Sequence, residues 1–395
     1  MLLQSKNDFP NGQPRQAAYL KDPSVGRRPE LFSLPGRALR FARSALSKHC
    51  WYLIFSVTDR CNQRCLMCFN QTVESHPELT LDEIRKVAEG FSSLYQLTLS
   101  GGEPLLRPDL PEIVAAFNAR RAIPRITLPS NGQLPERLEQ LASRLCRENH
   151  DSMINVALSL DGVGVVHDRI RGVEGAFERH EESRERILSL AKLHPNLSLV
   201  IASVLSTFNA KDMDSLLDYV QQMSWPPRHG IMLARGETRE SSAKDVDSGF
   251  ALDVLRRFRE MQRPYQSRLE QAWLDVYHRN RLETIARARM VDPCLAGRKL
   301  LVLDARGQLS PCEMLSSLMR SGQVAYRGSS SFGNVRETNY RLDTLLGSPE
   351  AASLTGFIRG GGCACTFECA LLNNFALNWR NYPRVLARLV KSLLR

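Results

Sequence analysis

The chain has 395 residues, 43% of them hydrophobic and 24% charged, a composition that excludes collagen-like, coiled-coil and intrinsically disordered proteins. Lys and Arg number 53 against 42 Asp and Glu, and the resulting net charge of +11 favours an acidic partner. No segment reaches the ~20 consecutive apolar residues of a membrane span, and residues 1–30 lack the apolar run of a signal peptide. We therefore expect a cytoplasmic protein.

The N-terminal segment is expected to form a partly ordered, basic extension. Residues 1–35 are rich in Pro, Gly and polar side chains, a composition typical of weakly ordered termini. Residues 38–46 combine apolar and basic side chains at helical spacing, as in amphipathic helices that bind membrane surfaces. This segment therefore predicts a short basic helix before the first strand.

The sequence then alternates strand-like and helix-like segments as far as residue 240. Residues 81–88 and 183–190 have the apolar spacing of a helix face. Six strands are predicted, at residues 51–57, 97–99, 125–128, 153–159, 197–204 and 230–233. This order predicts an α/β fold in which repeated βα units build a parallel sheet.

Most of the predicted strands end in a polar or glycine-rich turn. These turns are a cysteine-containing loop after the first strand and residues 100–104, 129–132, 159–162 and 235–237. In a β/α barrel the carboxyl ends of the strands form the active face. We therefore expect the five turns to meet at one mouth.

The ten cysteines indicate metal binding or catalysis, because cytosolic thiols are kept reduced. Cys61, Cys65 and Cys68 form a CxxxCxxC run directly after the first strand. A closed zinc site needs four protein ligands, whereas three thiolates on an iron–sulfur cluster leave one iron open. By spacing alone the run also fits half of a zinc site. Cys50 and Cys146 stand apart and are expected to be buried apolar thiols.

The CxxxCxxC run, followed after the second strand by Gly101-Gly102-Glu103-Pro104, resembles the radical S-adenosylmethionine (radical SAM) enzymes. The resemblance implies a partial six-stranded (β/α)6 barrel. It also implies a [4Fe-4S] cluster held by the three cysteines, with its fourth iron chelated by S-adenosylmethionine (SAM). The activity implied is reductive cleavage of SAM to a 5′-deoxyadenosyl radical, which abstracts hydrogen from a substrate.

The same resemblance implies a set of SAM-binding residues. By this resemblance, Glu103 and the carbonyl groups of its turn accept hydrogen bonds from the ammonium group of the methionine part of SAM, and Arg171 pairs with its carboxylate. The residue before the third cysteine is commonly aromatic and packs near adenine, and here it is Met67. The complete set is Met67, Gly101, Gly102, Glu103, Ser130, Asn131, Ser159, Asp161 and Arg171.

A second group of cysteines lies downstream. Cys294 and Cys312 with Gly307 between them resemble the opening of a SPASM or twitch auxiliary-cluster domain, and residues 299–311 predict a β-hairpin that brings the two thiols together. The full SPASM pattern has seven cysteines, whereas this region has five. We therefore expect one auxiliary [4Fe-4S] cluster, with a redox-inactive four-cysteine zinc ribbon as the alternative. The expected ligands are Cys294, Cys312, Cys369 and either Cys363 or Cys365.

These features predict five consecutive segments. In chain order they are a basic extension (1–49), a radical SAM core barrel (50–240), a helical linker (241–291), a small α+β auxiliary-cluster domain (292–375) and an amphipathic C-terminal helix (376–395). The apolar stripe of the last helix is expected to pack on the barrel, with an anionic membrane as the alternative surface.

The substrate is predicted only by class. Families with this auxiliary domain mostly modify peptides or proteins, and a lipid or another small metabolite is the alternative. The resemblance also implies a flavodoxin or ferredoxin as electron donor. A non-catalytic, nucleic-acid-binding metalloprotein is disfavoured, because the strand-end turns would have no role and the basic residues do not interleave with aromatic ones.

Overall fold

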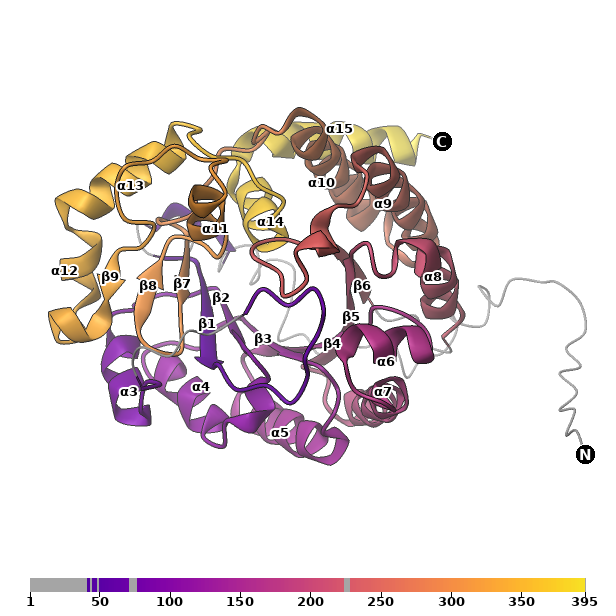
Figure 1. The fold of residues 1–395 in the computed structure, drawn as a ribbon, viewed down its shortest axis with the longest axis horizontal. Coiled ribbons are helices and arrows are strands. Elements are labelled where there is room, and N and C mark those ends of the chain that lie inside the picture. Colours follow the sequence, from indigo (N-terminus) through magenta and orange to yellow (C-terminus); the bar gives the residue numbers. More distant parts are fainter. Residues whose placement is uncertain (1–40, 43–44, 48–49, 71–76, 224–227, 395) are drawn as a thin grey trace, which may run out of the picture.

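The computed structural model describes residues 41–42, 45–47, 50–70, 77–223 and 228–394 (Figure 1). The predicted extension at residues 1–35 lies outside the described residues. The predicted helix at 38–46 is described only in part, with residues 41–42 and 45–46 helical. None of the described helices is long and apolar enough to cross a membrane.

Six parallel strands form the central sheet and confirm the predicted α/β fold. Each strand pairs with the next one along the chain, so the order in space follows the order in sequence. The strands are β1 (Tyr52–Thr58), β2 (Gln96–Gly101), β3 (Arg125–Ser130), β4 (Met153–Ser159), β5 (Leu197–Leu205) and β6 (Arg228–Leu233). β1 is almost wholly buried, as expected for a parallel strand covered on both faces.

Helices between the strands cover the outside of the sheet (Figure 1). A capping box between Thr80 and Glu83 starts the first of them, and Pro135 occupies the first turn of another. These helices are α3 (Leu81–Glu89), α4 (Leu110–Asn118), α5 (Pro135–Glu148), α6 (Val165–Arg171), α7 (Ala176–Leu193) and α8 (Met213–Gln222). The repeated βα order matches the partial barrel that the sequence predicts.

The predicted hairpin after residue 299 is present, and it extends the same sheet. β7 (Leu300–Leu303) pairs in parallel with β1, while β8 (Gln308–Ser310) and β9 (Gly333–Asn334) continue antiparallel. The sheet therefore has nine strands in the order β6-β5-β4-β3-β2-β1-β7-β8-β9. The strand pairing of β7 with β1 fixes this region directly beside the cysteine loop.

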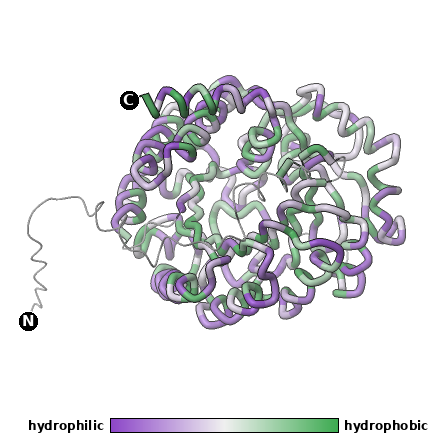
Figure 2. Tube along the Cα trace, turned by 180° about the vertical axis from the view of Figure 1, so that it is seen from behind, coloured by the Kyte–Doolittle hydropathy of each residue, from purple (hydrophilic) through white to green (hydrophobic). Residues whose placement is uncertain are grey.

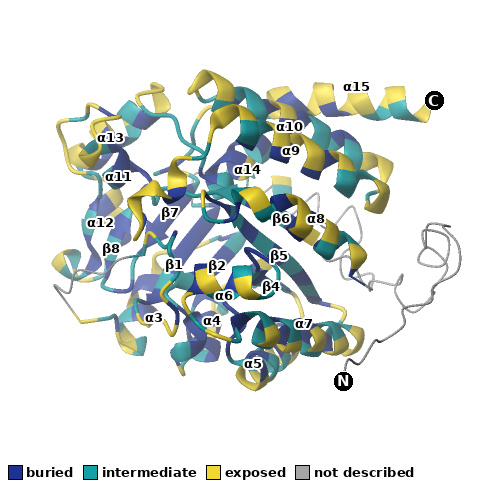
Figure 3. Cartoon of the chain, turned by 45° about the vertical axis from the view of Figure 1, so that its right-hand side comes forward, coloured by how far each residue is buried: buried dark blue, intermediate teal, exposed yellow. Residues whose placement is uncertain are grey.

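The remaining helices follow β6 in the chain. They are α9 (Ser248–Gln262), α10 (Arg268–Arg287), α11 (Leu315–Arg320), α12 (Leu342–Leu346), α13 (Pro349–Arg359), α14 (Glu368–Leu377) and α15 (Tyr382–Leu393). Buried residues from both halves, such as Leu53, Leu301 and Phe367, belong to one hydrophobic core. Figures 2 and 3 show hydrophobic and buried segments inside and hydrophilic, exposed helix faces outside.

Candidate functional site

The loop after β1, which carries the first three cysteines, lies across the strand ends (Figure 1). Backbone hydrogen bonds tie it to three separate segments. The N–H of Glu103 donates to the carbonyl of Arg60 at 2.8 Å, the N–H of Leu66 to Ile170 at 3.0 Å, and the N–H of Arg239 to Cys68 at 2.9 Å. The loop is thus held by the segments after β2, β4 and β6.

Two glycines allow the loop to approach β2 closely. Gly101 has φ +125°, and a Cβ there would lie 2.2 Å from the carbonyl oxygen of Thr58. A Cβ on Gly102 would lie 2.2 Å from the carbonyl oxygen of Arg60. Both positions need glycine because the backbones are in contact, which gives a physical reason for the Gly-Gly pair.

The three cysteines line a cavity of about 480 Å³, a size within the usual range for small-molecule sites. Most of the predicted SAM-binding residues line it as well. The full lining is Asp59, Cys61, Gln63, Arg64, Cys65, Cys68, Asn70, Ser100, Gly101, Gly102, Glu103, Pro104, Pro129, Ser130, Asn131, Ser159, Arg171 and Arg239. In the described part of the chain, no three His, Cys, Asp or Glu side chains are grouped so as to hold a metal ion.

Glu103 is a buried carboxyl group at the wall of this cavity. It accepts hydrogen bonds from the N–H groups of Asn131 at 2.8 Å and Leu105 at 3.1 Å. Burial nevertheless raises the pKa of Glu103 to about 7. A positive group entering the cavity would favour the charged carboxylate, so this side chain suits a ligand with an ammonium group.

Arg171 lines the cavity from the end of α6. Its guanidinium forms an ion pair with the buried Asp161 and reaches the sulfur of Cys65 at 3.7 Å. Burial lowers the pKa of the adjacent His167 to about 2, so this imidazole is neutral and its Nδ1 accepts from the N–H of Asp161. The arginine is therefore positioned by Asp161, which is not itself part of the cavity lining.

The structure places two predicted SAM-binding residues away from the cavity. Met67 is buried in a small apolar cluster with Ile170 and Ala243, and it does not line the cavity. Asp161 lies behind Arg171 rather than in the lining. Sequence reasoning missed Arg64 and Arg239, which do line it.

The downstream cysteines lie partly buried against the main core. Cys312 is close enough to Cys365 and Cys294 for their charges to raise its pKa further, after burial as the main cause. Burial likewise raises the pKa of Cys363 to about 11 and that of Cys365 to about 12. Four of the five cysteines therefore lie within range of one another's charges.

Cys369 lies in a different setting, in the first turn of α14. Burial raises the pKa of Cys369 to about 11, and Tyr52 on β1, whose hydroxyl is hydrogen-bonded to Thr98, is near enough to influence that pKa. Of the two isolated cysteines, Cys146 is buried as predicted, whereas Cys50 is half-buried and its thiol donates to the carbonyl of Tyr52 at 3.3 Å.

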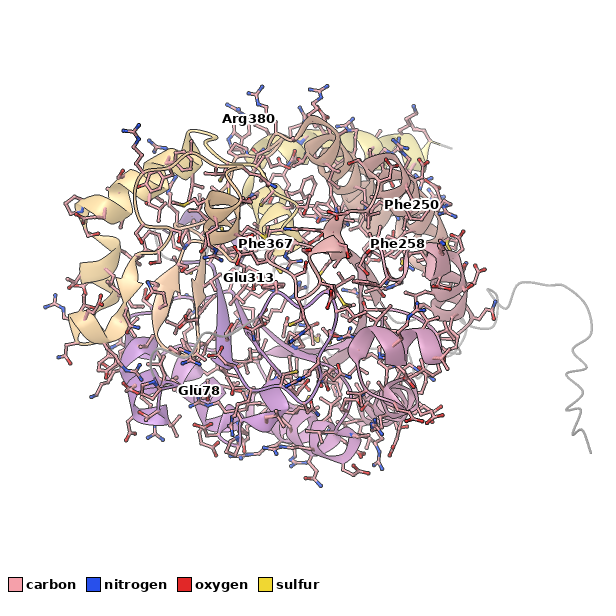
Figure 4. All side chains as sticks on the ribbon, in the orientation of Figure 1. Glu78, Phe250, Phe258, Glu313, Phe367 and Arg380 are labelled. Carbon is pink, nitrogen blue, oxygen red and sulfur yellow. The ribbon has the colours of Figure 1, made fainter. Side chains whose placement is uncertain are left out.

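A partly buried arginine connects the two cysteine regions. Arg235, just after β6, pairs with Glu313 and with Glu368, each at 3.3 Å. Its guanidinium also lies 5.3 Å from the ring centre of Phe69 and 4.9 Å from that of Phe367. Figure 4 shows Glu313 and Phe367 near the centre of the molecule. Phe69 follows Cys68, and Glu313 follows Cys312, so one side chain contacts neighbours of both groups.

Comparison with known proteins identifies the class. Residues 55–220 match the family model of the radical SAM superfamily. This region of the chain is a radical SAM domain, and the protein is a SAM-dependent iron–sulfur enzyme whose cofactors are a [4Fe-4S] cluster and SAM.

A curated relative is similar in sequence over most of the chain, and two solved structures share its fold. The AdoMet-dependent heme synthase of Methanosarcina barkeri is 27% identical over 312 residues, which cover 73% of this chain and 80% of the relative. The structure of anSMEcpe with AdoMet and the Cp18Cys peptide aligns with a TM-score of 0.55 at 16% identity, covering 86% of this chain and 99% of that one. The structure of Streptococcus suis SuiB bound to the precursor peptide SuiA aligns with a TM-score of 0.52 at 16% identity, covering 91% and 75%.

Proposed function

We propose that Cys61, Cys65 and Cys68 hold the SAM-binding [4Fe-4S] cluster and that the adjoining cavity holds SAM. The observation that carries this proposal is the shared lining, in which three thiols face the same space as the buried Glu103. Three cysteines leave one iron without a protein ligand, which suits chelation by the amino and carboxylate groups of SAM. When bound, cluster and SAM supply a 5′-deoxyadenosyl radical that abstracts hydrogen from the substrate.

The chain's own residues bind and orient SAM in this proposal. Glu103 and the carbonyl groups of its turn accept hydrogen bonds from the ammonium, and Arg171 donates to the carboxylate. Because Asp161 already pairs with Arg171 from below, the guanidinium is fixed before SAM arrives. Ser130, Asn131 and Ser159 supply further polar contacts from the neighbouring strand ends.

Anaerobic reconstitution tests the proposal. The protein should take up iron and sulfide and show the broad visible absorbance of an iron–sulfur cluster. After reduction with dithionite it should form 5′-deoxyadenosine from SAM. Iron uptake without 5′-deoxyadenosine would contradict the assignment of the cavity, and zinc without cluster absorbance would contradict the assignment of the cysteines.

The downstream cysteines are proposed to hold one auxiliary [4Fe-4S] cluster, as expected for a SPASM- or twitch-like region. The proposed ligands are Cys294, Cys312, Cys369 and one of Cys363 and Cys365. A second possible ligand set is Cys294, Cys312, Cys363 and Cys365, because the charges of these four thiols influence one another. Iron counts of the single Cys363→Ala, Cys365→Ala and Cys369→Ala proteins distinguish the two ligand sets.

The substrate is proposed to be a peptide or protein segment. Support comes from the fold, because the structures of anSMEcpe with the Cp18Cys peptide and of SuiB with the precursor peptide SuiA align over most of this chain. A small metabolite is the second candidate, favoured by the similarity to a heme synthase over 73% of the chain. A lipid remains within this second class.

Fractionated cell extract distinguishes the two substrate classes. A true substrate should increase the formation of 5′-deoxyadenosine above the uncoupled rate. Stimulation that resides in a peptide fraction and disappears after protease digestion would support a peptide. Stimulation by a protease-resistant, low-molecular-weight fraction would instead support the metabolite.

A further inference from the structure

The C-terminal helix α15 leaves most of its apolar face on the surface. Val385, only 6% exposed, and the partly buried Leu389 pack with α10 residues such as Val276. By contrast, Leu386 is 61% exposed and Leu393 58%. The expectation that the whole stripe packs on the barrel is therefore wrong, because only one edge of it is covered, and it is covered by α10.

The exposed part of this face forms a shallow apolar groove. Figure 3 shows α15 as a mostly exposed helix along the edge of the molecule, and Figure 2 shows its C-terminal end as hydrophobic. The groove is lined by Pro383, Leu386, Ala387, Val390, Lys391 and Leu394. Leaving several leucine and valine side chains in water costs free energy, so such a face favours a partner.

The surroundings of the groove are basic. Residues 376–395 contain five Lys or Arg residues and no Asp or Glu. Arg388 lies 2.9 Å from Asp275, but two further arginines, Arg259 and Arg263, share that carboxylate at 2.7 Å. The acidic side chain is thus already compensated, and the positive charge around α15 is in excess.

Aromatic side chains stand at the start of the same helix. Trp379 is 68% exposed and Tyr382 is 38% exposed. The guanidinium of Arg380 lies 5.9 Å from the Trp379 ring, and Figure 4 shows Arg380 at the outer edge. Trp and Tyr are favoured where an apolar layer meets a polar one, which is the environment of a membrane interface.

We propose that α15, together with Trp379, docks on an anionic lipid bilayer. Such a surface offers acyl chains to the groove and negative headgroups to Arg384 and Lys391 at the same time. A symmetric contact with a second copy fits less well, because it would bring the basic side chains of both copies together. No residue of α15 lines the SAM cavity, so docking leaves that cavity unchanged.

Vesicle co-sedimentation of the full chain tests this docking surface. Binding to phosphatidylcholine vesicles that contain phosphatidylglycerol should be at least ~10-fold tighter than binding to pure phosphatidylcholine, and it should weaken with salt. The double variant Leu386→Ser/Val390→Ser should lose ~10-fold or more, because both side chains leave the apolar layer. The matched control Leu193→Ser/Leu346→Ser removes two exposed leucines elsewhere and should bind as the wild type does.

The role of the basic side chains and the insertion of Trp379 into the lipid are tested separately. Arg384→Glu/Lys391→Glu should weaken binding to the anionic vesicles, whereas Arg85→Glu/Arg341→Glu should not. Brominated lipids should quench tryptophan fluorescence of the wild type, and Trp379→Phe should remove that quenching. All variants should retain uncoupled SAM cleavage, which keeps this proposal separate from the function of the cavity.

Three outcomes would overturn the proposal. One is that the wild type fails to sediment with anionic vesicles. Another is that binding is the same for the Leu386→Ser/Val390→Ser protein. The third is a wild-type dimer in sedimentation velocity that this double variant converts to a monomer, because the groove would then be an interface between copies.

Discussion

The two cysteine regions of this enzyme differ in how much space they leave beside the thiols. Cys61, Cys65 and Cys68 lie on a loop that opens onto a cavity, and Cys61 is exposed. The downstream cysteines are packed against the main core, and none of them lines that cavity. The first region therefore has room for a small molecule beside its thiols, whereas the thiols of the second region pack against side chains of the core.

The sharpest test of this contrast removes the first region. The triple variant Cys61→Ala/Cys65→Ala/Cys68→Ala should form no 5′-deoxyadenosine and should retain about four of about eight irons per chain. Iron analysis and chromatography of the reaction products measure both effects. Cys146→Ala, which changes a thiol outside both regions, should keep its full iron content. If the triple variant still cleaves SAM, the first cysteine region is not the site of SAM cleavage.

The reciprocal change removes one downstream ligand. Cys294→Ala should lose about four irons, because an incomplete ligand set no longer holds its cluster. Uncoupled SAM cleavage should persist, since the cavity and its three cysteines are untouched. If iron content stays at the wild-type value, Cys294 is not a ligand.

Arg235 links the two cysteine regions, so its substitution should strongly lower the free energy of unfolding. Arg235→Leu leaves Glu313 without its partner in a buried setting and should cost about 3 kcal/mol or more of unfolding free energy. Arg341→Leu breaks an exposed pair with Asp343 and should cost about 1 kcal/mol or less. Urea denaturation measures the difference, and equal costs would mean that Arg235 is not a structural link.

Glu103→Gln should weaken SAM binding about ten-fold, equivalent to about 1.4 kcal/mol, because the amide cannot offer a negative charge to the ammonium. Glu350→Gln, on exposed α13, serves as the control. Calorimetric titration of the reconstituted proteins measures the affinity. Unchanged affinity in the Glu103 variant would remove this carboxyl group from the site.

The same residue gives a pH dependence to the cofactor-free protein. The pKa of Glu103 is about 7 in the folded chain against 4.5 for an exposed glutamate, so the folded state binds the proton more tightly. The free energy of unfolding should therefore fall as the pH rises from about 4.5 to about 7. This component should be missing in Glu103→Gln. A wild type and variant with identical pH profiles would contradict the raised pKa.

The smallest expected effect concerns electron delivery. Arg60, Arg64 and Arg239 are exposed near the first cysteine region, and the proposed flavodoxin or ferredoxin donors are usually acidic. The reduction rate with such a donor should fall several-fold as added salt shortens the screening length below ~10 Å. Photoreduction with deazaflavin should show little salt dependence. A reduction rate with the protein donor that does not depend on salt would show that these arginines do not attract the donor.

The barrel and most of its site could be predicted because their signals are local. Buried parallel strands are continuous apolar runs, and the site residues follow those strands directly in sequence. The Gly101-Gly102 turn and Glu103 were recognised in this way, and the structure places them in the cavity lining.

Long-range contacts could not be predicted in this way. The ion pairs of Arg235 join residues 78 and 133 positions apart, and nothing near Arg235 in sequence signals them. Met67 fills an apolar cluster made by distant segments. The amphipathic pattern of residues 382–393 predicted a helix. The pattern alone does not show how much of the apolar stripe is covered by neighbouring helices.

The parallel pairing of β1 with β7 has a consequence for shortened forms of the chain. A protein ending at residue 291 would keep the six βα units but would expose the free hydrogen-bonding edge of β1, including the apolar Leu53 and Phe55. Uncovered edges of this kind recruit strands from other molecules. By pairing with β1, β7 therefore also protects the sheet against aggregation, and loss of this strand should reduce solubility more than loss of any downstream cysteine.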